Sequence, residues 1–151
     1  MPELPEVETT RRGIEPFLLD QSILAIEVRQ PRLRWPVDLP PNLAGSKVIN
    51  VSRRGKYILI TTHVGTLLIH LGMSGSLRVV SPQTPPKLHD HIDIKLTGDH
   101  WLRFNDPRRF GSFHFQKGDA HQHWLLKDLG VEPLENEFSG DYLFNSSRRR
   151  K

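Results

Sequence analysis

The 151-residue sequence predicts a mainly β protein, a two-layer antiparallel β-sandwich with an N-terminal helix and further short helices near its end. Two observations predict this class. One helical pattern near the N-terminus is followed by a series of short apolar or alternating runs bounded by turn residues, a spacing typical of sandwiches. The hydrophobic share of 36% and the 11 glycines are close to globular values, so the chain can bury a core.

The N-terminal helix is predicted from about Glu6 to Leu18. Acidic residues come first and basic residues later, which suits the helix dipole, and prolines at positions 2 and 5 suit a helix start. Apolar side chains spaced by three, four and seven residues share one face. These residues are Leu4, Val7, Ile14 and Leu18, with Arg11 at the margin of the face.

Eight strands are predicted after the helix. Their ranges are 22–29, 47–51, 57–62, 66–71, 76–80, 91–96, 101–104 and 112–115. The proline-rich stretches 31–41 and 81–87 are predicted to be surface loops. Helical signals return after Gly118, with one short helix around Trp124 to Leu129 and another over about 140–147. We therefore divide the chain into a sandwich domain, 1–135, and a helix and linker, 136–151.

Composition and charge exclude several classes of protein. No apolar run approaches the roughly 18 residues of a membrane span, and the N-terminus is acidic where a signal peptide would be basic. We therefore expect a soluble protein that is not exported by that route. The absence of cysteine excludes disulfides, thiol catalysis and thiolate zinc sites. A net charge of +4 suits a polyanionic partner without proving one.

Pro2 carries the most specific chemistry that the sequence offers. If Met1 is removed, Pro2 becomes a terminal secondary amine with a pKa near 8, which is partly unprotonated and nucleophilic at neutral pH. Attack of this amine on the anomeric carbon of a sugar gives a cationic iminium, an electron sink for elimination, and Glu3 could act as the acid that opens the sugar ring. If Met1 stays, the Pro2 nitrogen is an amide and cannot attack. The alternative is that Pro2 and Pro5 only start a helix.

Several sequence islands resemble one family of enzymes. They are PELPEVET at 2–9, RRGIEP at 11–16, RLRWP at 32–36, RRGKY at 53–57, HLGMSGSLR at 70–78, HDH at 89–91, DPRRFG at 106–111 and LGVEPL at 129–134. In order and approximate spacing they resemble bacterial formamidopyrimidine-DNA glycosylases, which are bifunctional base-excision repair enzymes. The resemblance covers the whole chain and implies a sandwich fold whose helix places Pro2 and Glu3 at the edge that faces DNA.

The resemblance implies roles for the residues near the N-terminus. Pro2 would be the Schiff-base nucleophile and Glu3 the acid that helps to expel the base and open the ribose. Glu6 would lie near the damaged nucleoside, although a role as partner of the helix dipole explains it equally well. Lys56 would contact phosphate near the lesion and assist catalysis.

The resemblance also implies which side chains enter the duplex. Met73 would fill the space left by the flipped base, Arg108 would bind the orphaned cytosine, and Phe110 would wedge the neighbouring step. Without the family, Met73 is interpreted as an exposed hairpin residue and Arg108 as a turn charge. The presence of all three favours oxidised purines, such as 8-oxoguanine and formamidopyrimidines, over the oxidised pyrimidines of the related endonuclease VIII branch.

Four further residues are predicted to lie at the DNA surface. His70, Arg34 and Arg109 would either contact phosphates or brace loops, and His91 is included among the DNA contacts. Histidine pairs with H-x-H spacing, at 89 and 91 and at 121 and 123, suggest a metal site. With no cysteine, and with 89–93 matching a family strand that holds no metal, we expect none.

Complete members of the family continue into a helix-two-turn-helix domain and a four-cysteine zinc finger, and neither is in this sequence. The resemblance therefore implies an isolated catalytic domain with no cofactor of its own, zinc being expected only in the missing finger. We expect a bacterial cytoplasmic monomer, associated with the nucleoid, whose partner is double-stranded DNA containing oxidised purines or abasic sites. The alternative is a DNA-binding fragment that is inactive without its C-terminal half.

Overall fold

The computed structural model describes residues 3–117. Its first element is helix α1, Leu4–Leu18, which begins two residues earlier than the sequence pattern predicts. The backbone N–H of Glu3, the residue before the helix, donates a hydrogen bond to Glu6 Oε1 at 2.7 Å. Because this side-chain acceptor satisfies a donor at the helix start, and Pro5 needs none, the first turn is stable from Leu4 onward.

All eight predicted strands are present. The strands are β1, Ile23–Val28; β2, Val48–Arg54; β3, Tyr57–Thr62; β4, Gly65–His70; β5, Ser76–Val80; β6, Asp90–Leu96; β7, Trp101–Asn105; and β8, Ser112–Gln116. A short 3-10 helix, η1, Pro41–Leu43, lies in the connection from β1 to β2. Only β2 differs substantially from expectation, because it runs three residues further, to Arg54, where it pairs with Tyr57 across a tight turn.

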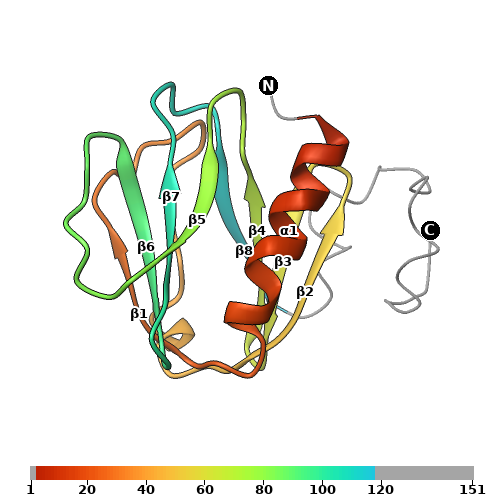
Figure 1. Cartoon of the computed structure of the whole chain (residues 1–151), viewed down its shortest axis with the longest axis vertical. Helices are drawn as coiled ribbons and strands as arrows, with labels where there is room; N and C mark the ends of the chain where they lie inside the picture. The colour runs from red at the N-terminus through yellow and green to blue at the C-terminus, as the bar shows by residue number, and fades with distance from the viewer. Residues whose placement is uncertain (1–2, 118–151) are drawn as a thin grey trace.

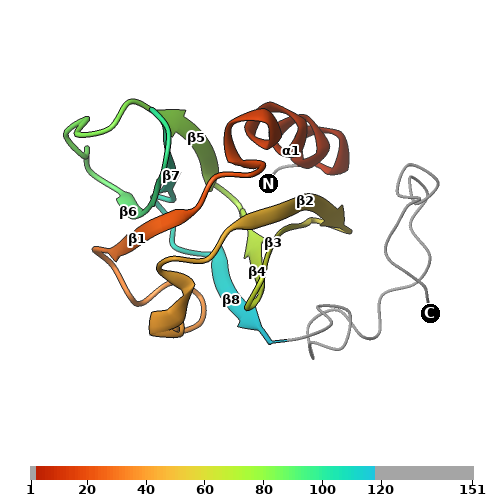
Figure 2. The same cartoon turned by 90° about the horizontal axis from the view of Figure 1, so that it is seen from below.

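The strands form two antiparallel sheets of four. One sheet has the order β1-β6-β7-β5 and the other the order β2-β3-β4-β8, and the two layers face each other (Figure 1). Inward side chains such as Ile58, Leu67, Ile92 and Phe104 are buried between them. Helix α1 lies along the edge strands β5 and β2 and closes that side of the sandwich (Figure 2). The predicted fold class is confirmed.

A buried ionic cluster covers the outer face of the first sheet. Arg103 on β7 makes a two-pronged interaction with Asp93 on β6 at 2.8 and 3.0 Å, and Arg29 makes a second one at 2.9 and 3.1 Å. Arg103 also donates to the carbonyl of Thr84 at 2.8 Å. The proline-rich loop before β6 is therefore held against the sheet by the guanidinium group.

Five segments reach the same end of the molecule. The start of α1, the first part of the β1–β2 connection, the β2–β3 turn and the loops β4–β5 and β7–β8 all lie at the top of the view in Figure 1. The residues with predicted functions come from these segments. Within residues 3–117, no helix is long and apolar enough to cross a membrane. The short helices predicted after Gly118 and the boundary at residue 135 lie outside the described residues.

Candidate nucleic-acid interface

The start of α1 carries the predicted catalytic acid. Glu3 is exposed and immediately precedes the helix, and Pro2, its neighbour in sequence, lies outside the described residues. Glu6 is also exposed, and its carboxylate is engaged by the Glu3 backbone. Glu6 therefore caps the start of the helix, where the sequence suggested a partner of the helix dipole. Its role near a lesion stays a prediction.

Glu8 anchors the helix to the second sheet. Its side chain is buried and accepts hydrogen bonds from Arg11 at 2.9 and 3.0 Å, Arg12 at 2.8 Å and Arg53 at 3.1 Å. Burial raises the pKa of the Glu8 carboxyl, but the hydrogen bonds from the three guanidinium groups outweigh it and lower this pKa to about 2. The carboxylate is thus charged throughout the physiological range.

Arg53 extends this link to the turn that carries Lys56. Its Nη1 donates to the carbonyl of Gly55 at 2.9 Å, and its side chain is almost fully buried. A continuous chain of polar contacts therefore runs from Glu8 on α1 to the residue next to Lys56. Sequence reasoning did not find the pair Glu8 and Arg53. The available signal was a doubled arginine at the end of the predicted strand region.

His70 lies beside Lys56 and Arg34. Its Nδ1 accepts the backbone N–H of Gly72 at 2.9 Å, and its ring packs edge-on against Tyr57 with centroids 4.9 Å apart. Burial lowers the pKa of the His70 imidazole, and the positive charges of Lys56 and Arg34 lower it further. The ring is therefore neutral with its proton on Nε2, and it braces the start of the β4–β5 loop.

The three residues predicted to enter the duplex are exposed on two neighbouring loops, as expected. Met73 in the β4–β5 loop is 44% exposed and Phe110 in the β7–β8 loop is 45% exposed. Arg108 is exposed, and its guanidinium lies 5.4 Å from the centre of the Phe110 ring. Their contacts with DNA stay predictions.

The two loops touch backbone to backbone. A Cβ placed on Gly72 would lie 2.5 Å from the backbone nitrogen of Gly111 and the backbone carbon of Phe110. Gly72 also has a φ of +66°, in the left-handed region that glycine tolerates best. Glycine is needed here on both counts, and the close approach brings the loop that carries Met73 against the loop that carries Phe110.

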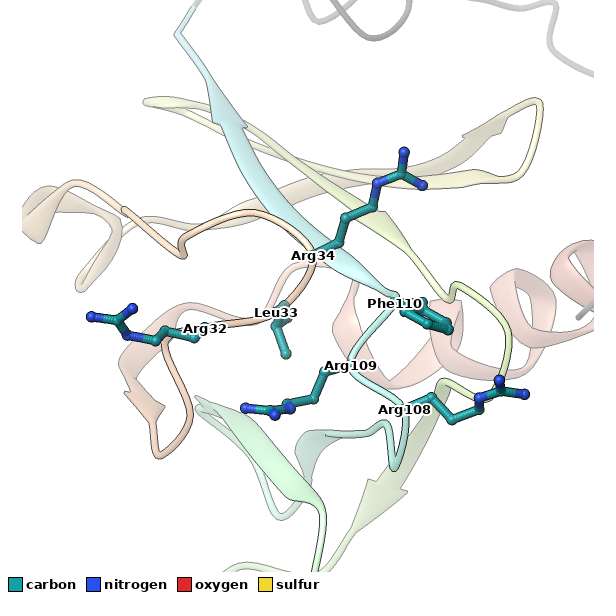
Figure 3. Close-up of a pocket in the computed structure, with 6 residues that line it drawn as sticks. All are labelled: Arg32, Leu33, Arg34, Arg108, Arg109 and Phe110. Carbon is teal, nitrogen blue, oxygen red and sulfur yellow. The ribbon is translucent and has the colours of Figure 1, made fainter.

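An arginine-lined pocket of about 530 Å³ opens beside these loops. Its lining residues are Arg32, Leu33, Arg34, Arg108, Arg109 and Phe110. Figure 3 shows that the arginines come from two facing loops, with Leu33 between the loops. The loops are joined by a hydrogen bond from the Arg34 backbone N–H to the carbonyl of Gly111 at 3.3 Å. No carboxylate is among the described residues that line the pocket, so it suits an anion.

His91 is where the structure departs from expectation. Its side chain is buried, and Nε2 lies 2.8 Å from the backbone carbonyl oxygen of Asp106. A ring that is covered by the protein and bonded to its backbone does not present a donor to DNA, so the prediction of direct DNA contact by His91 disagrees with this geometry. The neighbouring prediction for Arg109 agrees better, because its exposed side chain lines the pocket.

Comparisons with known proteins decide the family. Residues 1–113 match the model of the formamidopyrimidine-DNA glycosylase N-terminal domain. The chain belongs to this family. Relatives named formamidopyrimidine-DNA glycosylase include those of Hahella chejuensis, 55% identical over 100% of this chain, and Cellvibrio japonicus, 53% identical over 99% of it. The chain spans 56% of the length of each of these two relatives.

Solved structures of this glycosylase family share the fold. The chain is similar to the Lactococcus lactis formamidopyrimidine-DNA glycosylase non-covalently bound to DNA with an abasic site, with a TM-score of 0.78 and 36% identity. That match covers 87% of this chain and 52% of the other. The same enzyme in complex with Fapy-dG DNA matches with a TM-score of 0.75 and 35% identity, over 83% of this chain and 48% of the other.

Proposed function

We propose that this chain is the catalytic domain of a bifunctional DNA glycosylase and abasic-site lyase that removes oxidised purines from double-stranded DNA. The observation that carries the proposal is the convergence at one end of the molecule of an exposed Glu3, an arginine-lined pocket and three exposed residues on joined loops. This arrangement combines a catalytic acid, a surface that can bind phosphate and side chains that can fill a gap in the duplex.

The proposed reaction uses the terminal amine of Pro2. The nitrogen attacks C1′ of the damaged nucleoside, the bond from C1′ to the base breaks, and the base leaves with a proton that balances the one lost by the Pro2 nitrogen. Glu3 supplies the proton that opens the ribose ring. The resulting iminium accepts the electron pair of the C2′–H bond, so that loss of the C2′ proton expels the 3′ phosphate. Lys56 binds phosphate beside the lesion. This chemistry needs no metal or organic cofactor.

Phosphate contacts come from the cationic surface around the pocket. Arg34, Arg109 and His70 orient the duplex without reading its sequence, and each good contact adds roughly one unit to the salt dependence of binding. Met73 occupies the space vacated by the flipped base, Phe110 wedges the adjacent step and Arg108 donates to the unpaired cytosine. The stacking of Arg108 on Phe110 supports this role, because it holds both side chains outward at the same point.

Relatives support the class of substrate. The Lactococcus lactis enzyme is bound to abasic-site DNA in one structure and to Fapy-dG DNA in another. We extend these partners to this chain, and we place its activity on the bacterial chromosome, as a cytoplasmic monomer. 8-Oxoguanine and formamidopyrimidines are the proposed lesions.

Borohydride trapping tests the proposal. The 151-residue chain, shown by mass spectrometry to begin at Pro2, is incubated at low salt with duplexes that contain an abasic site or 8-oxoguanine. We expect a reducible adduct on the abasic duplex and a weaker one on 8-oxoguanine, since extraction of an intact base costs a few kcal/mol more. Pro2→Gly, which replaces the secondary terminal amine with a primary one, should weaken the adduct, and Glu3→Gln should reduce it.

The outcomes separate the two functional hypotheses. An adduct that forms on a chain beginning at Pro2 and weakens in Pro2→Gly supports the enzyme. Binding of the abasic duplex without any adduct, from a chain that begins at Pro2, would instead establish a DNA-binding fragment without autonomous chemistry.

A further inference from the structure

Asp106 is a fully buried acidic residue at the junction of the two exposed loops, with an exposed fraction of 0%. It follows β7 directly and begins the loop that carries Arg108 and Phe110. Sequence reasoning gave it no role. Its burial is unexpected for a carboxylate in a loop, because an acidic side chain is rarely removed from water unless its oxygens are bonded.

Both carboxylate oxygens accept short hydrogen bonds from different loops. Oδ1 accepts the hydroxyl of Ser74, in the β4–β5 loop, at 2.7 Å, and Oδ2 accepts the backbone N–H of Gly111, at the far end of its own loop, at 2.7 Å. Ser74 Oγ in turn accepts the backbone N–H of Arg108 at 3.1 Å. The Asp106 side chain thus joins Ser74, next to Met73, to Gly111, next to Phe110, and Ser74 extends the link to Arg108.

The backbone of Asp106 is anchored as well. Its N–H donates to the carbonyl of His89 at 3.0 Å, and its carbonyl accepts from His91 Nε2 at 2.8 Å and from the Arg109 N–H at 3.2 Å. The backbone that carries the carboxylate is therefore bonded to His91 on β6 and to His89, the residue before β6. The buried His91 therefore supports the interface from beneath, through its bond to the Asp106 carbonyl.

We propose that Asp106 is a positioning residue that holds Met73, Arg108 and Phe110 as one preformed unit for insertion into DNA. This inference rests on the proposed function. If the two loops were independent, they and their three side chains would lose conformational freedom on entering the duplex. Loops that are already joined have lost this freedom before DNA binds. Ser74 links the two loops, because it bonds both the Asp106 carboxylate and the Arg108 backbone.

The test uses Ser74→Ala in the 151-residue chain, with Ser76→Ala as the matched control. Both replace a partly buried serine with alanine, and Ser76 has no comparable link to Asp106 among the bonds found in residues 3–117. Affinity is measured for a duplex with a tetrahydrofuran abasic analogue and for the same undamaged duplex. We expect Ser74→Ala to lower the ratio of the two affinities about fivefold, the value for loss of about one net hydrogen bond, and to leave undamaged-duplex binding unchanged. Ser76→Ala should match the wild type.

Amide hydrogen exchange, without DNA, tests the link by itself. We expect the Arg108 amide to lose protection in Ser74→Ala while the Gly111 amide keeps it, and both to lose it in Asp106→Ala. Rapid exchange of Gly111 in the wild type would overturn the inference whatever the DNA results.

The failure of the inference and the failure of the proposed function differ. A wild type that prefers abasic DNA, with Ser74→Ala equal to it, overturns the positioning role alone. A wild type without any preference for abasic DNA contradicts the proposed function and, with it, the use of the unit for insertion.

Discussion

Glu8 Oε1 accepts a hydrogen bond from Arg53 Nε at 3.1 Å, and this contact joins two residues 45 positions apart in the chain. The bond fixes the helix that leads from the N-terminus to the strand that leads to Lys56. Together with the hydrogen bond from Arg11 to the carbonyl of Val51 at 3.1 Å, it holds helix α1 against the strand that leads to Lys56.

Removal of Glu8 should destabilise the domain strongly. Glu8→Ala leaves the guanidinium of Arg53 buried without this carboxylate, and breaking a buried pair in this way typically costs about 3–5 kcal/mol. Urea denaturation measures the change in the free energy of unfolding. Glu15→Ala is the control, since Glu15 contacts Arg11 at 3.3 Å from a more exposed position and should cost less than about 1 kcal/mol. Equal losses for the two variants would refute the anchoring role.

The same carboxylate predicts an acid dependence of stability. The Glu8 pKa falls from 4.5 to about 2 on folding, so the carboxylate contributes stability above pH 4.5 and loses it as the pH falls toward 2. The difference in unfolding free energy between the wild type and Glu8→Gln should be constant from pH 7 to about 5 and then shrink. A difference that does not change down to about pH 2 would contradict this account.

His70 should titrate below the ordinary histidine value of 6.5. Burial and the charges of Lys56 and Arg34 lower its pKa, and protonation would destroy the Nδ1 acceptor of the Gly72 amide. Folding stability from this group is therefore present above pH 6.5 and falls as the pH drops toward the folded-state pKa. NMR should show the Gly72 amide shifting together with the His70 ring. Lys56→Met should raise the pKa of His70, since it removes a repulsive positive charge. An unchanged His70 pKa would count against the proximity of Lys56 and His70.

Gly72 should tolerate alanine poorly. Gly72→Ala adds both backbone strain and a Cβ only 2.5 Å from the opposite loop. Gly45→Ala isolates the strain, because Gly45 has a φ of +92° but a Cβ added there would meet no other atom within 4 Å. Thermal unfolding should show a cost of about 1 kcal/mol for Gly45→Ala and clearly more for Gly72→Ala. Similar costs would mean that the loops separate easily.

Local patterns predicted most of the fold. The apolar spacing in 57–62 and 76–80 gave strand bounds that the structure reproduces without change, because inward and outward side chains alternate around a buried sheet. The early start of α1 was missed because the bond from the Glu3 backbone to Glu6 satisfies a donor ahead of the predicted first turn.

The site was harder to predict, because its supports act across long sequence separations. The family resemblance placed Met73, Arg108 and Phe110 at the surface, where they lie. It did not indicate that Asp106 joins their loops or that His91 is buried beneath them, since neither contact leaves a periodic pattern. Buried polar partners become visible only when the strands that carry them are brought together.

Peptide mapping of the borohydride-reduced adduct tests the central claim most directly. The chain that begins at Pro2 is trapped on an abasic duplex and digested, and the DNA-bearing peptide is sequenced by mass spectrometry. The account predicts attachment at the Pro2 nitrogen, with a weaker adduct in Pro2→Gly, whose terminal amine is primary. Attachment at the ε-amine of Lys56, or complete absence of an adduct on DNA that the chain binds, would contradict it.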